Sequence, residues 1–166
     1  MYIIPPQTTI GHVHLTVGDL DRALAFYQGI LGFQITTRYG TGAVFLSAGG
    51  YHHHIGLNTW QGQGVSPAPA GHAGLYHVAI LYPTRAALAT AIQRLVTATY
   101  PITGFADHGV SEAVYLDDPD GNGIELYVDR PRSEWKYAAD GTVAMVTEPL
   151  DVAALLALAE PPVSEE

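Results

Sequence analysis

Apolar and polar residues follow the same order twice along this chain. Residues 10–17, IGHVHLTV, alternate between the two classes, which is typical of a strand with one buried face. Asp19 then favours the start of a helix and Gly32 its end. Between them apolar side chains recur at helical spacing, at Leu20, Leu24, Tyr27 and Leu31. The first segment therefore predicts a strand followed by an amphipathic helix.

Three more strands are predicted after this helix. Runs rich in β-branched and aromatic residues alternate there with turns that contain glycine. The runs are Phe33–Arg38, Ala43–Ser47 and His52–Thr59. The first unit therefore has the order β-α-β-β-β.

The second segment repeats this order. Tyr76–Ile80 has the character of the first strand, and Thr84 is placed to cap a helix with one apolar face. That face carries Leu88, Ile92 and Leu95, and further strands are predicted near Ile102–Phe105, Ala113–Leu116 and Gly123–Val128. AVFLSAGGYHHHIGL of the first unit aligns with AVYLDDPDGNGIEL of the second, with one extra residue in the first turn. An internal repeat of this kind dictates the architecture.

The repeat divides a single predicted domain into parts. Module one covers about residues 9–60, a Gly/Pro/Ala-rich linker covers 61–74, and module two covers about 75–130. An extension over 131–166 includes a short C-terminal helix, capped by Asp151 or Thr147 and running to about Ala159. Its Leu155, Leu156 and Leu158 are expected to dock on the domain or on a second subunit, and the tail PPVSEE to be disordered.

One β-α-β-β-β sheet is too small to bury its own face. Two copies are therefore expected to pair around a common concave interior, which makes the fold class α+β with a shared metal site. The first and last strands of each unit would line this interior, so His12, His77 and Glu125 can converge there. We expect only one of His12 and His14 to face inward, and choose His12 because it aligns with His77.

Glu125 is unusual because it interrupts the apolar strand IELYV. A buried carboxylate is costly unless it is paired or bound to a metal, and alternation places Glu125 on the same face as Gly123 and Tyr127. An outward-facing Glu on a half-exposed strand is the alternative reading. The repeat favours the metal site, since two histidines and one carboxylate form the facial triad of non-haem Fe(II) oxygenases.

These residues lie in motifs that resemble a known family. The motifs are IGHVHLTVGDLDRALAFYQGILGF, YHHHIGLNTW, GLYHVAI and DHGVSEAVYLDDPDGNGIELYVDRP. They resemble the vicinal-oxygen-chelate superfamily, and within it the type I extradiol catechol 2,3-dioxygenases. The resemblance implies a metal-dependent ring-cleaving dioxygenase that acts on a catechol-type aromatic with O2.

The resemblance also implies roles for individual residues. The metal ligands match His12, His77 and Glu125, with Fe(II) as the metal, Mn(II) as the alternative, and Ni or Zn as substitutes after purification. The acid–base histidine matches the His52–His54 run, where counting back from Leu57 favours His53. Strand alternation would turn His53 toward the metal if Ile55 and Leu57 also face the interior. The catalytic set is completed by the matches Tyr115 and His108. The alternative is that these residues have only structural roles. Tyr115 would then be an ordinary core residue like its repeat partner Phe45, and the three histidines would form a solvated strand edge.

Other members of the superfamily provide alternative functions. A glyoxalase-like lyase uses a further carboxylate from the last strand of the first unit, where this chain has only His54, Ile55 and Gly56. A fosfomycin-resistance-type transferase needs cationic groups for its phosphonate, and Lys136 is the single lysine. A small-molecule-sequestering resistance protein has no use for a complete ligand triad. Methylmalonyl-CoA epimerase shares the fold, so fold alone does not decide the chemistry.

Composition narrows the list of partners. The formal charge of −9, with 7 Lys plus Arg, argues against binding to nucleic acid or anionic membranes. The absence of cysteine excludes disulfides and zinc–thiolate sites. No membrane span or signal peptide is recognisable, so a cytoplasmic protein is expected. The family's usual second pair of modules is missing from these 166 residues, and a homodimer is expected to replace it.

Overall fold

The structure is a computed structural model that describes residues 1–69 and 71–160. The chain forms two compact units, Met1–Pro67 and Ala68–Glu166. Their boundary falls inside the 61–74 stretch whose composition predicted a linker. Each unit contains a four-stranded mixed sheet in β-α-β-β-β order, so the α+β class and the internal repeat are confirmed. No helix in the described part of the chain is long and apolar enough to cross a membrane.

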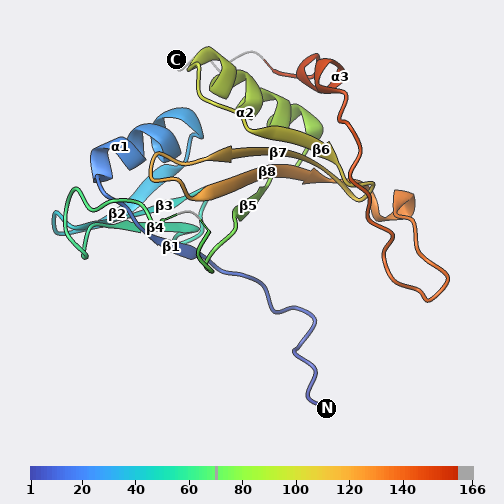
Figure 1. The fold of residues 1–166 in the computed structure, drawn as a ribbon, viewed down its shortest axis with the longest axis horizontal. Coiled ribbons are helices and arrows are strands. Elements are labelled where there is room, and N and C mark those ends of the chain that lie inside the picture. The colour runs from blue at the N-terminus through green and yellow to red at the C-terminus, as the bar shows by residue number, and fades with distance from the viewer. Residues whose placement is uncertain (70, 161–166) are drawn as a thin grey trace. The chain divides into compact units, whose positions relative to one another are not determined.

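The sheet of the first unit has the strand order β1-β4-β3-β2 (Figure 1). The pair β1–β4 is parallel and the other pairs are antiparallel. The strands are β1 Val13–Thr16, β2 Gln34–Tyr39, β3 Ala43–Ser47 and β4 Ile55–Asn58. The helical segment consists of α1 Leu20–Leu24 and the π-helical turn η1 Ala25–Ile30. Asp19 caps α1 by accepting a hydrogen bond from the Arg22 amide, and Gly32 follows η1 with a φ of +86°, as the sequence predicted.

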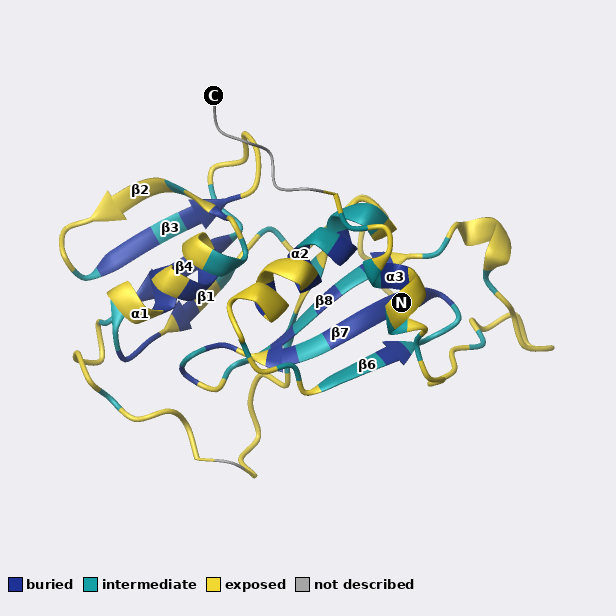
Figure 2. Cartoon of the chain, turned by 90° about the horizontal axis from the view of Figure 1, so that it is seen from above, coloured by how far each residue is buried: buried dark blue, intermediate teal, exposed yellow. Residues whose placement is uncertain are grey.

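The second unit repeats this arrangement with the order β5-β8-β7-β6. Its elements are β5 Val78–Leu81, α2 Arg85–Thr97, β6 Gly104–Asp107, β7 Ser111–Asp117 and β8 Gly123–Asp129. Thr84 caps α2 through the Ala87 amide, and the apolar face of the helix is fully buried against the sheet. Figure 2 shows the alternation along β8, where buried and half-buried positions follow one another, whereas β7 is buried along most of its length. Each sheet therefore has a helix face, packed on its own helix, and an opposite face that we call the distal face.

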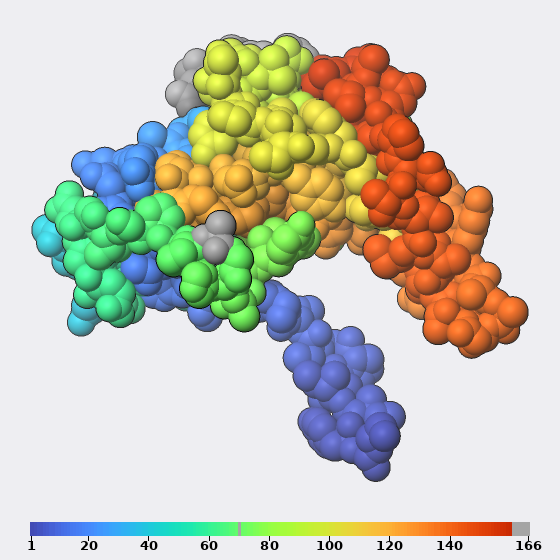
Figure 3. All heavy atoms as spheres, in the orientation of Figure 1, coloured from blue at the N-terminus to red at the C-terminus, as the bar shows by residue number. Residues whose placement is uncertain are grey.

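The C-terminal extension follows the second sheet. It includes the 3-10 turn η2 Arg132–Glu134 and helix α3 Val152–Leu156, which Asp151 caps through the Ala154 amide. Leu155 is buried where α3 meets α2, whereas Leu158 is exposed. Figure 3 shows this extension in orange and red and the exposed residues 1–10 as an extended blue segment. The helix ends at Leu156, three residues earlier than predicted, and the tail PPVSEE lies outside the described residues.

One strand boundary differs in a way that affects the site. The strand predicted over His52–Thr59 begins only at Ile55, so the three histidines lie in the turn before it. Ile55 and Leu57 pack on the helix face, since they pair with Val13 and Leu15 and are buried. Ile55 and Leu57 therefore do not meet the condition on which alternation would turn His53 toward the metal, and alternation does not extend into the turn that carries His53.

The turn between β7 and β8 is organised by the buried side chain of Asp118. Its Oδ1 accepts hydrogen bonds from the Asp120 and Asn122 amides, both at 2.9 Å, and its Oδ2 accepts one from Asn122 Nδ2 at 2.9 Å. Gly121 supplies the φ of +78° that the turn requires. This turn sets a register in which Tyr115 lies directly opposite Glu125, as the sequence predicted.

Replacing Asp118 with Ala should destabilise the protein by about 3 kcal/mol, because two backbone amides and one side-chain amide lose their acceptor in a buried turn. Urea unfolding measures the effect. Asp118→Asn is the matched control, since it keeps one acceptor oxygen and should cost about half as much. Equal losses for both variants would show that the carboxylate oxygens do not organise the turn.

Candidate metal and acid–base site

In the second unit, Glu125 and His77 face each other. Glu125 lies in the middle of β8 on the distal face, while its neighbours Ile124 and Leu126 are buried on the helix face. His77 precedes β5, whose first residue pairs with Ile124. His77 Nε2 lies 3.0 Å from Glu125 Oε2, and the two side chains are 31% and 12% exposed. The carboxylate predicted from the sequence is thus paired with the histidine predicted from the repeat.

The donor atoms of this pair fit a divalent metal ion. Two adjacent ligands of one octahedral ion, each bound at about 2.1 Å, are separated by about 3 Å, which is the separation found between Nε2 and Oε2. The His77 Nδ1 atom is buried and has no hydrogen-bond partner among the described residues. Nε2 is therefore the ring nitrogen available for a functional contact, and it points at the carboxylate.

A chain of hydrogen bonds continues from Glu125 to the C-terminal extension. Tyr115 Oη donates to Glu125 Oε1 at 3.1 Å, and His108 Nε2 lies 2.7 Å from Tyr115 Oη. His108 Nδ1 lies 2.8 Å from the Val146 carbonyl. Because a carbonyl only accepts, Nδ1 carries a hydrogen. The ring of His108 is thus held at both nitrogens, by the Val146 carbonyl and by the Tyr115 hydroxyl.

The environment of Tyr115 keeps its hydroxyl protonated. Burial, followed by the nearby charge of Glu125 and the hydrogen bond to it, raises the pKa of Tyr115 to about 12. At neutral pH the side chain is a hydrogen-bond donor. Tyr115 is therefore more than the core residue that its repeat partner Phe45 suggests.

In the first unit, His12 and His53 lie together. Their ring centroids are 4.4 Å apart, and His53 also packs edge-on against Phe45 at 4.9 Å. His54 has a different role, because its Nδ1 lies 3.0 Å from Ser47 Oγ. Partial burial, and then the neighbouring charge of His12, lowers the pKa of His53. Of the three consecutive histidines, His53 is the one whose ring contacts His12.

His14 corrects one prediction. Residues two apart on a strand share a face, so the argument that only one of His12 and His14 can face inward is wrong. The ring of His14 covers Gly56, where a Cβ would lie only 2.9 Å from it. Gly56 is the repeat partner of Glu125, and His14 is the repeat partner of Ala79. The first unit thus has a large residue beside a glycine where the second has an alanine beside the carboxylate.

Each unit supplies part of the predicted constellation. In the second unit, polar contacts link His77, Glu125, Tyr115 and His108. In the first unit, the rings of His12 and His53 are in contact. Among the described residues, no group of three or more His, Asp or Glu side chains is placed so that it could hold a metal ion. The Val146 carbonyl was missed from the sequence, since a backbone acceptor 38 positions from His108 carries no residue-type signal.

Comparison with known proteins identifies the family. Residues 9–126 match the model of the Glyoxalase/Bleomycin resistance protein/Dioxygenase superfamily. The chain belongs to this superfamily. The family resemblance read from the sequence motifs is thereby confirmed.

Named relatives of this superfamily member include dioxygenases. The chain is 42% identical over 156 residues to a catechol-2,3-dioxygenase of Bacillus subtilis (strain 168), covering 94% of this chain and 54% of the relative. It is 29% identical over 121 residues to biphenyl-2,3-diol 1,2-dioxygenase 3 of Rhodococcus globerulus, covering 72% of this chain and 63% of the relative. The chain therefore spans only about half to two thirds of the length of these relatives.

Solved structures show the same fold. A glyoxalase/dioxygenase from Nostoc punctiforme has a TM-score of 0.63 at 20% identity, covering 79% of this chain and 99% of that one. A lactoylglutathione lyase from Agrobacterium tumefaciens has a TM-score of 0.58 at 24% identity, covering 75% and 96%. These likenesses support the fold of the superfamily and do not select a reaction.

Replacing Gly123 with Ala should disturb the site, because a Cβ there would collide with the Tyr76 carbonyl and lie 3.2 Å from His77 Cβ. The segment that carries His77 must move, and we expect at least about tenfold weaker binding of a divalent metal. Gly104→Ala is the control, since its Cβ would meet only a ring atom of Tyr115 at 3.9 Å. Titration calorimetry with Mn(II) measures both variants, and equal affinities would contradict the prediction.

Proposed function

We propose that this protein is an extradiol ring-cleaving dioxygenase that acts on a catechol-type aromatic with O2. The observation that carries the proposal is the pairing of His77 Nε2 with Glu125 Oε2 at 3.0 Å, with Tyr115 hydrogen-bonded to the same carboxylate. Two potential metal ligands and a protonated phenol thus meet at one place. The names of the dioxygenase relatives support this reading over other reactions of the superfamily.

His12 is proposed as the third metal ligand, supplied by the first unit to His77 and Glu125 of the second. Two neutral nitrogens and one carboxylate suit Fe(II), with Mn(II) as the alternative, and a purified sample could carry Ni or Zn in its place. When bound, the metal would act as a Lewis acid toward the diol and would mediate the transfer of electrons from the diol to O2. The glutamate is the only charged member of the ligand set, so its position dominates metal binding.

The remaining residues handle protons and orientation. His53 is proposed to accept the second proton of the diol and to return it later, because an imidazole titrates near neutral pH and can act in both directions. Tyr115 is proposed to donate a hydrogen bond to a substrate oxygen. His108 orients that phenol, since its own ring is held between Tyr115 Oη and the Val146 carbonyl.

A glyoxalase-like lyase is the runner-up, because a lactoylglutathione lyase has a similar fold. That reaction would require a further carboxylate on the last strand of the first unit. On β4, Ile55 and Leu57 are buried on the helix face and Gly56 is covered by His14. The strand therefore offers no acidic side chain on its distal face, which disfavours the lyase.

A homodimer is proposed as the assembly. The proposal follows from the resemblance to a family whose members usually carry a second pair of modules. Sedimentation measures this directly.

Glu125→Gln should weaken Fe(II) binding by about a hundredfold, because it removes the charged ligand while preserving the shape of the side chain. Metal content after anaerobic reconstitution and desalting is the measurement. The matched control is Glu112→Gln, a carboxylate on the helix face of the neighbouring strand, which should retain its metal. If both variants retain their metal, Glu125 is not one of the metal ligands.

His53→Phe should keep fold and metal content but reduce turnover of catechols by about two to four orders of magnitude, the usual effect of losing one acid–base group. Formation of the yellow ring-cleavage product is the assay. His54→Phe and His52→Phe serve as neighbouring controls and should retain most of the activity. Normal turnover by His53→Phe would exclude it as the acid–base residue.

A further inference from the structure

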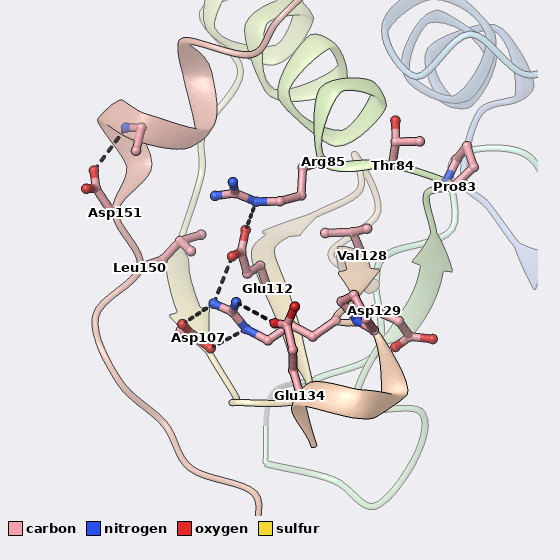
Figure 4. A pocket seen from close by; sticks show the side chains of 13 residues that line it. Pro83, Thr84, Arg85, Asp107, Glu112, Val128, Asp129, Glu134, Leu150 and Asp151 are labelled. Carbon is pink, nitrogen blue, oxygen red and sulfur yellow. Dashed lines mark hydrogen bonds and ion pairs between the residues drawn. The ribbon is translucent and has the colours of Figure 1, made fainter. Parts of the chain in front are cut away.

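A cavity of about 660 Å³ lies on the helix side of the second unit's sheet and is lined by a network of charged side chains (Figure 4). Glu112 is 3% exposed and lies between two arginines. Its Oε2 is 2.8 Å from Arg85 Nε, and its Oε1 is 2.9 Å from Arg130 Nη2. A buried carboxylate of this kind is tolerated only because both of its oxygens are paired.

Arg130 also binds the residue next to His108. Its Nη2 is 2.6 Å from Asp107 Oδ2 and its Nε is 3.3 Å from Asp107 Oδ1, which makes a two-pronged pair. The hydrogen bond from Arg130 is the main reason why the pKa of Asp107 is lowered. One guanidinium therefore neutralises both Asp107 and Glu112, which lie opposite each other in the β6–β7 register.

Asp107 in turn shapes the tight turn that carries His108. Its Oδ1 accepts a hydrogen bond from the Gly109 amide at 2.8 Å, and the His108 amide bonds the Ser111 carbonyl at 2.9 Å. The Arg130 amide donates to the Val110 carbonyl at 2.8 Å. Arg130 therefore holds this turn from two directions, by its side chain through Asp107 and by its backbone.

The same turn places the partner of His108 Nδ1. Asp107 forms two backbone hydrogen bonds with Glu148, both at 2.9 Å, and the Val146 amide donates to the His108 carbonyl at 3.1 Å. These hydrogen bonds hold the C-terminal extension against the turn after β6, so that the Val146 carbonyl lies within hydrogen-bond distance of the His108 ring. Displacement of Asp107 would move both the ring and its acceptor.

We propose that Arg130 is a positioning residue which, through its two-pronged pair with Asp107, fixes the orientation and the Nδ1-protonated tautomer of His108. Its effect on catalysis rests on the function proposed above, but its effect on the ring does not. Lysine cannot replace it, because a single ammonium cannot bind Asp107 at two points while also pairing with Glu112.

Arg130→Lys tests this by NMR and by kinetics. In the wild type, a proton–nitrogen correlation spectrum should show His108 as one tautomer with a slowly exchanging Nδ1 hydrogen, and in the variant as a mixture. With a catechol substrate, kcat should fall about ten- to a hundredfold, the effect of a displacement of about 1 Å, while KM changes less than about threefold. The NMR result does not require turnover, so an inactive chain would refute the proposed reaction and still test the positioning.

Two controls separate positioning from general stability. Glu134→Gln removes an exposed carboxylate 3.7 Å from the same guanidinium without touching the turn. Arg85→Lys disturbs the buried Glu112 from the other side. Both should leave the His108 signal unchanged, even if Arg85→Lys lowers the melting temperature as Arg130→Lys does.

Asp107→Asn provides a second variant if Arg130→Lys fails to fold. It keeps an oxygen for the Gly109 amide but loses the charge that pairs with Arg130, and should give the same change in His108. An unchanged His108 signal in the folded variants would overturn the proposal. So would an equal change in Arg85→Lys, which would show that the network acts only on stability.

Discussion

The charge of Glu125 is the constraint around which the second unit is arranged. Its side chain is only 12% exposed, and a carboxylate in that position is unfavourable unless its oxygens are satisfied. His77 faces one oxygen and Tyr115 donates to the other. His77 directly precedes β5 and Tyr115 lies on β7, the two strands that flank β8. The register of the sheet therefore decides whether the carboxylate of Glu125 has polar partners.

Two charged systems occupy opposite faces of that sheet. On the distal face, Glu125 pairs with a histidine and a phenol. On the helix side, Glu112 is paired through both of its oxygens with two arginines. The turn after β6 connects the two, since Asp107 binds Arg130 while its neighbour His108 bonds Tyr115.

The two units share one backbone arrangement but differ in the side chains at equivalent positions. At equivalent positions the first unit has His14 beside Gly56, and the second has Ala79 beside Glu125. The large and small residues are thus exchanged between the two strands. The repeat is therefore regular in its backbone and asymmetric in the side chains of its distal faces.

The sequence by itself determined the element order, both helix caps and the facing of Glu125, because periodicity, capping and turn chemistry are local. It also determined the Tyr115–Glu125 register, since the tight turn leaves little freedom between two strands. It failed at the histidine turn, where alternation no longer applies and only packing against His12 and Phe45 selects His53. The acceptor for His108 and the role of Arg130 were decided by tertiary structure alone. Both depend on contacts between residues 23 to 38 positions apart, and nothing in the local pattern of a chain records which distant backbone carbonyl or carboxylate will fold against it.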